Sequence, residues 1–202
     1  MSTVVEMRLS RNRAGSEEGF TLIELMVSAL LIVLVLSVVG GLMVSTTLTE
    51  RRVRDVTSAT NAGQLVARSV TTGIRNSANS VSTTAPFMLT NPTGNDQLLV
   101  ALKIGSAATV TSQCVAWYYS ATEHSVRYKT SATAIAAPSA ATLATWILLS
   151  TGITPFSGTA IFAPRGSKGI TLALKEDAGT GPDVVFQSSV TSRTGLTGSV
   201  RC

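Results

Sequence analysis

The strongest constraint in this sequence is an uncharged, apolar run from Leu25 to Val44. The run is about 20 residues long, and a helix of that length spans about 30 Å, the thickness of a bilayer's hydrocarbon core. Serines and glycines interrupt the run without removing its apolar character. The run therefore predicts a transmembrane helix. A cleaved secretory signal fits poorly, because no small-residue cleavage pattern follows Val44.

The helical pattern continues beyond the apolar run. Apolar side chains recur at spacings of three and four residues, at Val53, Val56, Leu65, Val66, Val70 and Ile74. This spacing is typical of a narrow apolar stripe along one face of a helix. No proline occurs before Pro86, so we expect one continuous helix from about Thr21 to about Asn76. The adjacent Gly40 and Gly41 are its weakest point, because each glycine costs about 1 kcal/mol of helix propensity.

The rest of the sequence changes to a period of two, which is typical of β-strands. Residues 84–96 combine prolines, glycine and Asn/Asp, and we interpret them as a turn. Strands are predicted at residues 97–104, 113–121, 124–131, 158–163, 169–176 and 183–192, and residues 142–150 are either a strand or a short helix. The expected fold class is therefore α+β, with a long N-terminal helix packed on a mainly antiparallel β-sheet.

The sequence contains two cysteines, Cys114 and Cys202. If the body of the protein faces an oxidising space, an even pair so far apart is consistent with one disulfide. Two unrelated buried thiols are the alternative. The disulfide is favoured, because a terminal cysteine in a frayed tail has little use in packing.

Charge and motifs give little indication of a ligand. The formal net charge is +5, and basic residues do not alternate with aromatic ones, so a dedicated nucleic-acid groove has no support. Arginines flank the apolar run on both sides, which leaves its orientation open. The one histidine, His124, lies on a predicted hairpin, and the sequence has no nucleophile motif or metal-ligand spacing. We expect no catalytic site, metal or cofactor. The acidic segment 176–183 is interpreted as a loop, with a calcium site as the alternative.

The residues before the apolar run carry a family resemblance. A short charged leader ends in Gly19, Phe20 follows, and "TLIEL" leads directly into the run. In this order the residues closely resemble the N-terminus of type IV prepilins and pseudopilins. The resemblance implies that prepilin peptidase cleaves between Gly19 and Phe20 and methylates the new amino terminus of Phe20. It also implies that the leader stays in the cytoplasm and that the rest of the chain faces outward beyond a single membrane span.

The resemblance implies a division into four segments. These are a cleaved leader (residues 1–19), a transmembrane assembly helix (20–48), an amphipathic helix half (49–80) and a β-rich globular head (81–202). The implied function is that of a structural subunit, a minor pilin or pseudopilin, in a type IV pilus or related filament. The implied partners are other pilin subunits, the peptidase and, indirectly, an assembly ATPase with its membrane platform protein.

Glu24 has two interpretations. Thr21 and Glu24 fit a T-x-x-E capping box, which satisfies free N–H groups at a helix start. In pilins, however, the matching glutamate is thought to pair with the N-terminal amine of a neighbouring subunit. A carboxylate at a membrane boundary is costly unless it is paired, so the assembly role is favoured. Both roles are compatible with one another at different stages.

The later sequence resembles W/J-type minor pilins in part. The similar stretches are "CVAWYYSATEHSVRYKTS" and the closing segments "WILLSTGITPFSG" and "GITLALKEDAG". Arg193 is followed by Thr194, where that subtype often has an Arg-Asn pair. The N-terminal motif encodes assembly and not what the filament touches, so a DNA-uptake pseudopilin and a tip adhesin are alternatives. A membrane-anchored enzyme is the least favoured class.

Overall fold

The computed structural model describes residues 21–79, 87–90, 94–104, 111–158, 160–193 and 202. The chain divides between Thr47 and Leu48 into two compact units. The first unit contains the beginning of the long helix. The second unit, Leu48–Cys202, contains the remainder of that helix and all the strands, and is called the head unit below.

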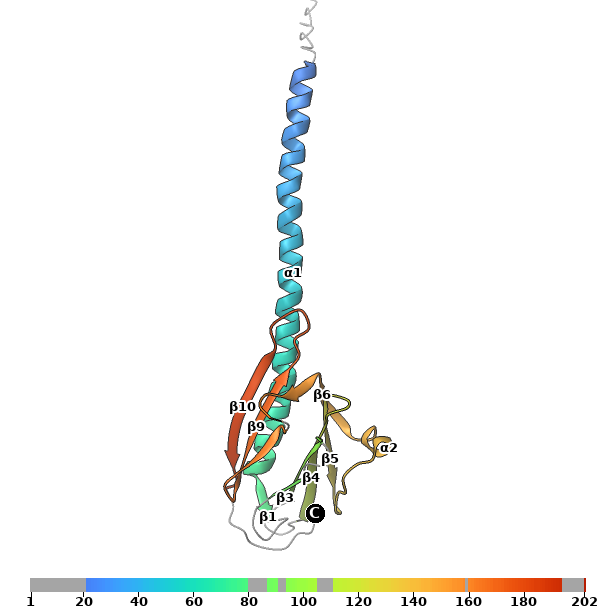
Figure 1. The fold of residues 1–202 in the computed structure, drawn as a ribbon, viewed down its shortest axis with the longest axis vertical. Helices are drawn as coiled ribbons and strands as arrows, with labels where there is room; N and C mark the ends of the chain where they lie inside the picture. The colour runs from blue at the N-terminus through green and yellow to red at the C-terminus, as the bar shows by residue number, and fades with distance from the viewer. Residues whose placement is uncertain (1–20, 80–86, 91–93, 105–110, 159, 194–201) are drawn as a thin grey trace, which may run out of the picture. The chain divides into compact units, whose positions relative to one another are not determined.

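Helix α1 runs from Leu22 to Arg75 and is 54 residues long. It confirms the expected continuous helix almost to the residue. The helix is drawn without a break in Figure 1, and Gly40 and Gly41 lie inside it. A hydrogen bond from the N–H of Asn76 to the carbonyl of Thr72 extends its last turn. Because α1 has no proline, its backbone hydrogen bonds continue across a change from apolar to amphipathic sequence.

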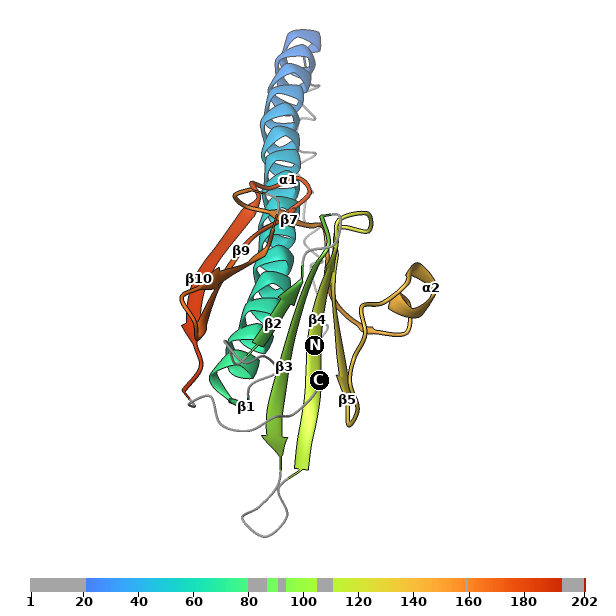
Figure 2. The same cartoon turned by 60° about the horizontal axis from the view of Figure 1, so that its bottom comes forward.

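The head unit contains two antiparallel sheets instead of the one that the sequence predicts. The larger sheet has the order β1-β3-β4-β5-β6, with β2 also pairing with β3 (Figure 2). Its strands are β1 (Ser77–Asn79), β2 (Phe87–Thr90), β3 (Asp96–Ile104), β4 (Thr111–Ser120), β5 (Ser125–Ser131) and β6 (Ile147–Thr151). Strands β3, β4 and β5 pair in unbroken register, so their alternating side chains point to two defined faces.

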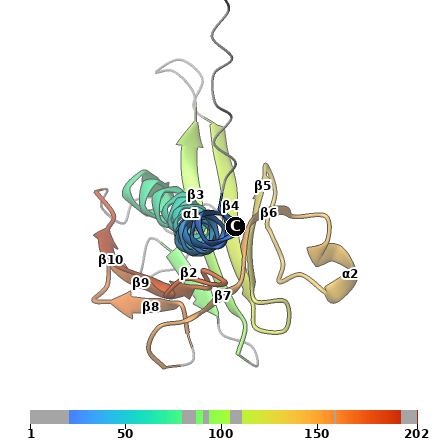
Figure 3. The same cartoon turned by 90° about the horizontal axis from the view of Figure 1, so that it is seen from above.

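The smaller sheet has β9 at its centre. Strand β10 pairs along one edge of β9, and β7 and β8 pair with β9 at different positions (Figure 3). The strands are β7 (Ile153–Pro155), β8 (Phe162–Arg165), β9 (Gly169–Glu176) and β10 (Val184–Thr191). Only Gly152 separates β6 from β7, at a positive φ of 80°, and this sharp turn carries the chain from one sheet to the other.

Most predicted strands are confirmed, and four predictions need correction. The strand predicted at residues 158–163 begins only at Phe162 and continues to Arg165 as β8. Residues 84–96 are not only a turn, because β2 forms within them and buries Phe87 against the core. Segment 142–150 contains both alternatives, with the short helix α2 (Ala140–Leu143) followed by β6. Strand β7 includes Pro155, in the interval between segments 142–150 and 158–163 where no strand was predicted. Burial of apolar side chains therefore outweighs the turn signals of neighbouring prolines and glycines.

The main core lies between the second half of α1 and both sheets. Helix residues Val66, Val70 and Ile74 are fully buried, and they belong to one cluster with residues of the larger sheet and of the smaller sheet. The other members of this cluster are Phe87, Leu98, Val100, Val115, Trp117, Tyr119, Val126, Ile153, Ile161, Phe162, Ile170, Leu172, Leu174 and Val190. One helix stripe thus holds two sheets together.

Two glycines allow α1 to approach the sheets closely. A Cβ atom at Gly63 would lie 2.0 Å from Cε2 of Phe186 on β10, and one at Gly73 would lie 2.1 Å from Cη2 of Trp117 on β4. Beside the second contact, the indole N–H of Trp117 donates a hydrogen bond of 2.8 Å to the hydroxyl of Ser69. The two glycines therefore set the distance between helix and sheets.

A second core lies on the opposite face of the larger sheet. It contains Cys114, Tyr118 and Trp146 with neighbouring side chains, and Cys202 packs against it. Cys114 and Cys202 form a disulfide, as the sequence predicts, and the N–H of Ile135 donates a hydrogen bond to the carbonyl of Cys202 at 2.9 Å. The last residue of the chain is therefore fixed to β4.

Replacing Gly73 by alanine is expected to lower the free energy of unfolding of the head unit by about 1–3 kcal/mol. The added methyl group would overlap the side chain of Trp117, which is 1% exposed and belongs to the main core. Thermal unfolding of the full chain in detergent micelles measures the change. Gly40→Ala is the matched control, because a Cβ atom there meets nothing within 4 Å. An unchanged unfolding temperature for Gly73→Ala would contradict the close packing.

Loss of the disulfide is expected to lower the free energy of unfolding by about 4 kcal/mol in the chain-entropy model. The two cysteines are 88 residues apart, so the bond closes a long loop in the unfolded chain. Urea denaturation of the full chain with and without dithiothreitol measures the effect. The Cys114→Ala/Cys202→Ala variant should unfold at the lower urea concentration under both conditions.

Candidate functional site

The start of α1 carries a helix cap at the residues that the sequence singles out. The hydroxyl of Thr21 accepts a hydrogen bond of 3.4 Å from the N–H of Glu24, and the carbonyl of Thr21 accepts from Glu24 and Leu25. Thr21 therefore acts as the N-cap. Within the described residues, the Thr21 N–H does not donate back to the Glu24 carboxylate, so only one half of the capping box is formed.

The carboxylate of Glu24 is thereby left available for another partner. Glu24 lies in the first turn of α1, is exposed, and has no ion-pair partner among the described residues. The positive end of the helix dipole favours a negative charge at this position. The predicted processing residues, Gly19 and Phe20, lie outside the described residues.

The first half of α1 presents apolar side chains on every side. The large apolar residues from Leu22 to Leu48 are each 54–78% exposed. The most hydrophobic window of the helix has a mean hydropathy of 2.9, and none of it is buried. A surface of this extent is covered by lipid or by protein in the native setting. The described chain thus contains one helix that is long and apolar enough to cross a membrane.

Three hydroxyl side chains in this part of α1 are satisfied by the helix itself. The hydroxyls of Ser28, Thr46 and Thr47 donate hydrogen bonds of 2.7–2.9 Å to the carbonyls four residues earlier. Such bonds remove the need for water at these groups, which lets the segment remain in an apolar environment. No neighbouring side chain lies near Gly40 or Gly41, so both remain open for contact with another helix.

The head unit has a cleft of about 580 Å³ that we call the acidic cleft. It lies between α1, strand β6 and the loop that follows β9. Its lining comprises Asp55, Ser58, Ala59, Ala62, Leu148, Leu149, Ser150, Thr151, Glu176, Asp177, Ala178, Gly179 and Thr180. The hydroxyl of Thr180 donates a 2.6 Å hydrogen bond to Asp55, and the N–H of Gly179 donates to Asp177. The two bonds shape the loop around the cleft.

Two carboxyl groups are buried in the head unit, and the sequence analysis missed both. Glu176 is 3% exposed, and its Oε1 accepts a 2.6 Å hydrogen bond from the hydroxyl of Ser150. Asp96 is fully buried, and its Oδ2 accepts a 2.5 Å bond from the N–H of Ile161. The second oxygen of each carboxyl group has no hydrogen-bond partner among the residues that the structure describes. Glu176 is the last residue of a predicted strand, and Asp96 is the last residue of the predicted turn 84–96. A polar residue is not unusual at either position, so no sequence signal revealed the burial.

Burial raises the pKa of both carboxyl groups above their ordinary values of 4.5 for Glu176 and 3.8 for Asp96. The hydrogen bonds from Ser150 to Glu176 and from Ile161 to Asp96 oppose this rise, and the nearby Asp177 adds to it at Glu176. Because the folded state holds these protons more tightly than the unfolded state, both groups favour folding most at low pH.

His124 and the acidic segment 176–183, the candidates for catalysis and metal binding, do not form a common site among the described residues. His124 lies in the turn between β4 and β5 with a positive φ of 48°, and it is exposed. In the acidic segment 176–183, Asp183 pairs with Lys175 at 2.8 Å, while Asp177 bonds to the backbone of its own loop. Within the described ranges, no three His, Cys, Asp or Glu residues lie together as metal ligands would.

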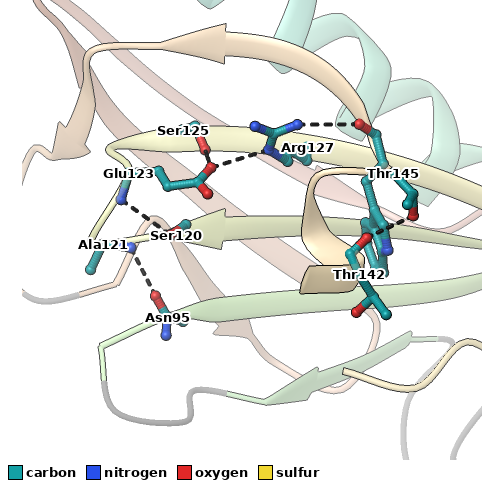
Figure 4. Close-up of polar contacts among 9 residues, drawn as sticks. Asn95, Ser120, Ala121, Glu123, Ser125, Arg127, Thr142 and Thr145 are labelled. Carbon is teal, nitrogen blue, oxygen red and sulfur yellow. Dashed lines mark hydrogen bonds and ion pairs between the residues drawn. The ribbon is translucent and has the colours of Figure 1, made fainter. Parts of the chain in front are cut away.

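The turn next to His124 is held by a polar network (Figure 4). Glu123 accepts hydrogen bonds from the hydroxyl of Ser125 and from Nε of Arg127, and Arg127 also donates to the carbonyl of Trp146. Lys129 lies 5.6 Å from the centre of the Trp146 ring. These contacts fix the hairpin to the segment before β6. Because Glu123 and Arg127 are used in these contacts, we do not consider the network a candidate reactive site.

Changing Glu176 to glutamine is expected to flatten the dependence of stability on pH. In the wild-type chain, the stabilising contribution of Glu176 is complete below its ordinary pKa and is lost as the pH rises through the raised pKa of the folded state. Glutamine stays neutral and keeps an oxygen for Ser150. Urea denaturation at pH 4 and pH 7 should show a smaller loss of stability for Glu176→Gln than for the wild-type chain. An equal loss in both proteins would contradict the raised pKa.

The first turn of α1, with Glu24 at the edge of an uncovered apolar surface, is the strongest candidate functional site in the described residues. Its components come from one helix, so its geometry does not depend on long-range packing. Comparisons with protein-family models, with curated proteins and with solved structures found no match to this chain.

Proposed function

We propose that this chain is a structural subunit of a membrane-assembled filament, a minor pilin or pseudopilin of a type IV pilus or a related machine. The observation that carries the proposal is the position of Glu24. An exposed carboxylate without an ion-pair partner among the described residues stands in the first turn of an apolar helix that nothing in the described chain covers. The residues before this helix resemble a prepilin processing site.

The physical chemistry of a bilayer explains why such a helix needs Glu24. Lipid tails are as apolar as leucine side chains, so the helix gains little free energy simply by exchanging lipid for other helices. An unpaired carboxylate at the membrane boundary is costly, and an ammonium group that approaches it removes the desolvation penalty of both charges. We infer that the amine of Phe20, exposed by processing, supplies this charge to Glu24 of a neighbouring subunit.

The cap at Thr21 supports the same role. It satisfies the Glu24 N–H through the Thr21 hydroxyl, while the Glu24 carboxylate is not used in the cap. The helix start is therefore stable before assembly, and the charge remains available. The interpretation as a cap and the interpretation as an assembly residue apply to different parts of Glu24, the backbone and the side chain.

The disulfide supports an extracytoplasmic head unit. Disulfides form and persist in oxidising compartments and are rare in the cytoplasm. A bond between Cys114 and Cys202 therefore favours a head unit outside the cytoplasm, on a single membrane span. This orientation is also the one that leaves residues 1–19 accessible to prepilin peptidase at the inner membrane face. An assembly ATPase and its platform protein would then act on the chain from the cytoplasmic side.

Replacing Glu24 by alanine is expected to leave processing intact and to remove the subunit from filaments. Mass spectrometry of the membrane-bound protein should show a mature chain that begins at methylated Phe20, in both the wild-type protein and the variant. Sheared filaments should contain the wild-type chain and at least about tenfold less of Glu24→Ala, as is expected when a buried charge loses its partner.

Glu24→Asp is the matched control, because it keeps the charge and the capping geometry at the backbone. It should be incorporated better than Glu24→Ala. Normal incorporation of Glu24→Ala would show that the cap alone accounts for this residue. A mature chain that begins elsewhere than Phe20 would contradict the proposed processing site.

A further inference from the structure

Surface carboxylates of the head unit fall into two groups. Three are used in ion pairs: Glu50 with Arg54, Glu123 with Arg127, and Asp183 with Lys175. Asp55 and Asp177 form no ion pair with any described residue, and both line the acidic cleft. In a chain with a net charge of +5, these two carboxylates, neither of them in an ion pair, thus line the same hollow, and of the two only Asp177 is close enough to act on the ammonium group of Lys175.

The wall of the acidic cleft contains a further unsatisfied group. Glu176 lines the cleft, its side chain is 3% exposed, and its Oε2 has no hydrogen-bond partner. A buried polar atom without a partner is uncommon in folded proteins and calls for an explanation. The Glu176 carboxyl group lines the same cleft as Asp55 and Asp177, which form no ion pair with any described residue. The cleft is therefore suited to bind a cationic group.

The rest of the lining indicates the kind of cation. Ala59, Ala62, Leu148 and Leu149 give the cleft apolar walls beside its carboxylates. Leu148 is 47% exposed although its side chain is large and apolar. A hollow with apolar walls and acidic ends matches an arginine side chain, whose methylene stem packs on apolar surface while the guanidinium donates to carboxylates.

Arg51 of α1 is an arginine that lies next to the cleft. It is exposed, it has no ion pair among the described residues, and it lies one helical turn before Asp55. Asp55, Ser58 and Ala62 follow Arg51 in successive steps of four, three and four residues, so Arg51 lies on the same helix stripe as the cleft. Arg51 and Asp55 of one chain are separated by about 6 Å along the helix axis.

We propose that the acidic cleft is a contact surface for a second copy of this chain and that it receives Arg51 of that copy. The proposal rests on the membrane-anchored assembly proposed above, because two copies anchored in one membrane are parallel. When two parallel copies face each other through this stripe, Arg51 of each lies about one helical turn from Asp55 of the other, within reach of an arginine side chain. The contact is therefore reciprocal.

An apolar seam continues this surface along the helix. Leu65 follows Ala62 on the stripe and is 51% exposed. It also borders a second hollow of about 340 Å³, between α1 and the aromatic side chains of Trp117 and Tyr128. The charged pair at one end would fix the register of the two copies, while Leu65 and Leu148 would be covered in the contact.

A charge exchange between the two positions tests the proposal. Donor-labelled and acceptor-labelled full chains are mixed in phosphatidylcholine vesicles, and energy transfer measures the association of copies. Arg51→Asp and Asp55→Arg should each weaken association about tenfold, because each creates like charges on both sides of a two-fold contact. The variant with both changes should return to within about threefold of the wild-type association, because it restores the opposite charges.

Arg52→Asp is the matched control. It makes the same charge change one residue away, but points about 100° around the helix from Arg51. It should leave association unchanged. Arg51 is exposed and has no described contact to lose, and thermal unfolding of each variant verifies that the head unit is folded.

Three outcomes would overturn the inference. These are no association of the wild-type chain, equal losses for Arg51→Asp and Arg52→Asp, and no recovery in the variant with both changes. None of them bears on processing at Phe20 or on filament entry through Glu24, which are measured separately. A chain that is processed and incorporated but insensitive to the charge exchange would retain the proposed function and lose only this contact.

Discussion

The packing of one stripe of α1 against two sheets is the interaction on which the head unit depends. Neither sheet closes on itself, and the buried helix residues Val66, Val70 and Ile74 belong to the one core cluster that contains side chains of both sheets. Gly63 and Gly73 bring the helix backbone against Phe186 and Trp117, one from each sheet. Because both sheets pack against the same rigid helix, α1 determines where each sheet lies in the head unit.

The same helix has different surroundings in its two halves, and its sequence changes accordingly. From Leu22 to Leu48 its large side chains are apolar on all sides, whereas in the head unit only one stripe is buried. The proposed role in a filament uses both halves. The first would pack among helices in an apolar setting where Glu24 supplies a directional interaction, and the second would hold a folded head unit and present Arg51 and Asp55 to a neighbour.

Sequence periodicity was sufficient for the helix and for most strands, because both depend on local patterns. The bounds of α1 and β9 agree with the prediction almost to the residue. The division into two sheets was not predictable, because it depends on a turn at Gly152 and on which strands pair over long distances. Glu24 was found from its motif. Asp55, Asp96 and Glu176 were not, because the sequence pattern does not show that three distant segments enclose them.

The disulfide has a consequence for the durability of the head unit. Strands β5 to β10 and helix α2 all lie between Cys114 and Cys202, inside one covalent loop. A protease that cuts any exposed connection in this loop leaves both fragments joined through the cysteines. The strands on either side of the cut also stay paired, since β4 holds β5 and β9 holds its three neighbours. A nicked head unit would therefore stay covalently attached to α1.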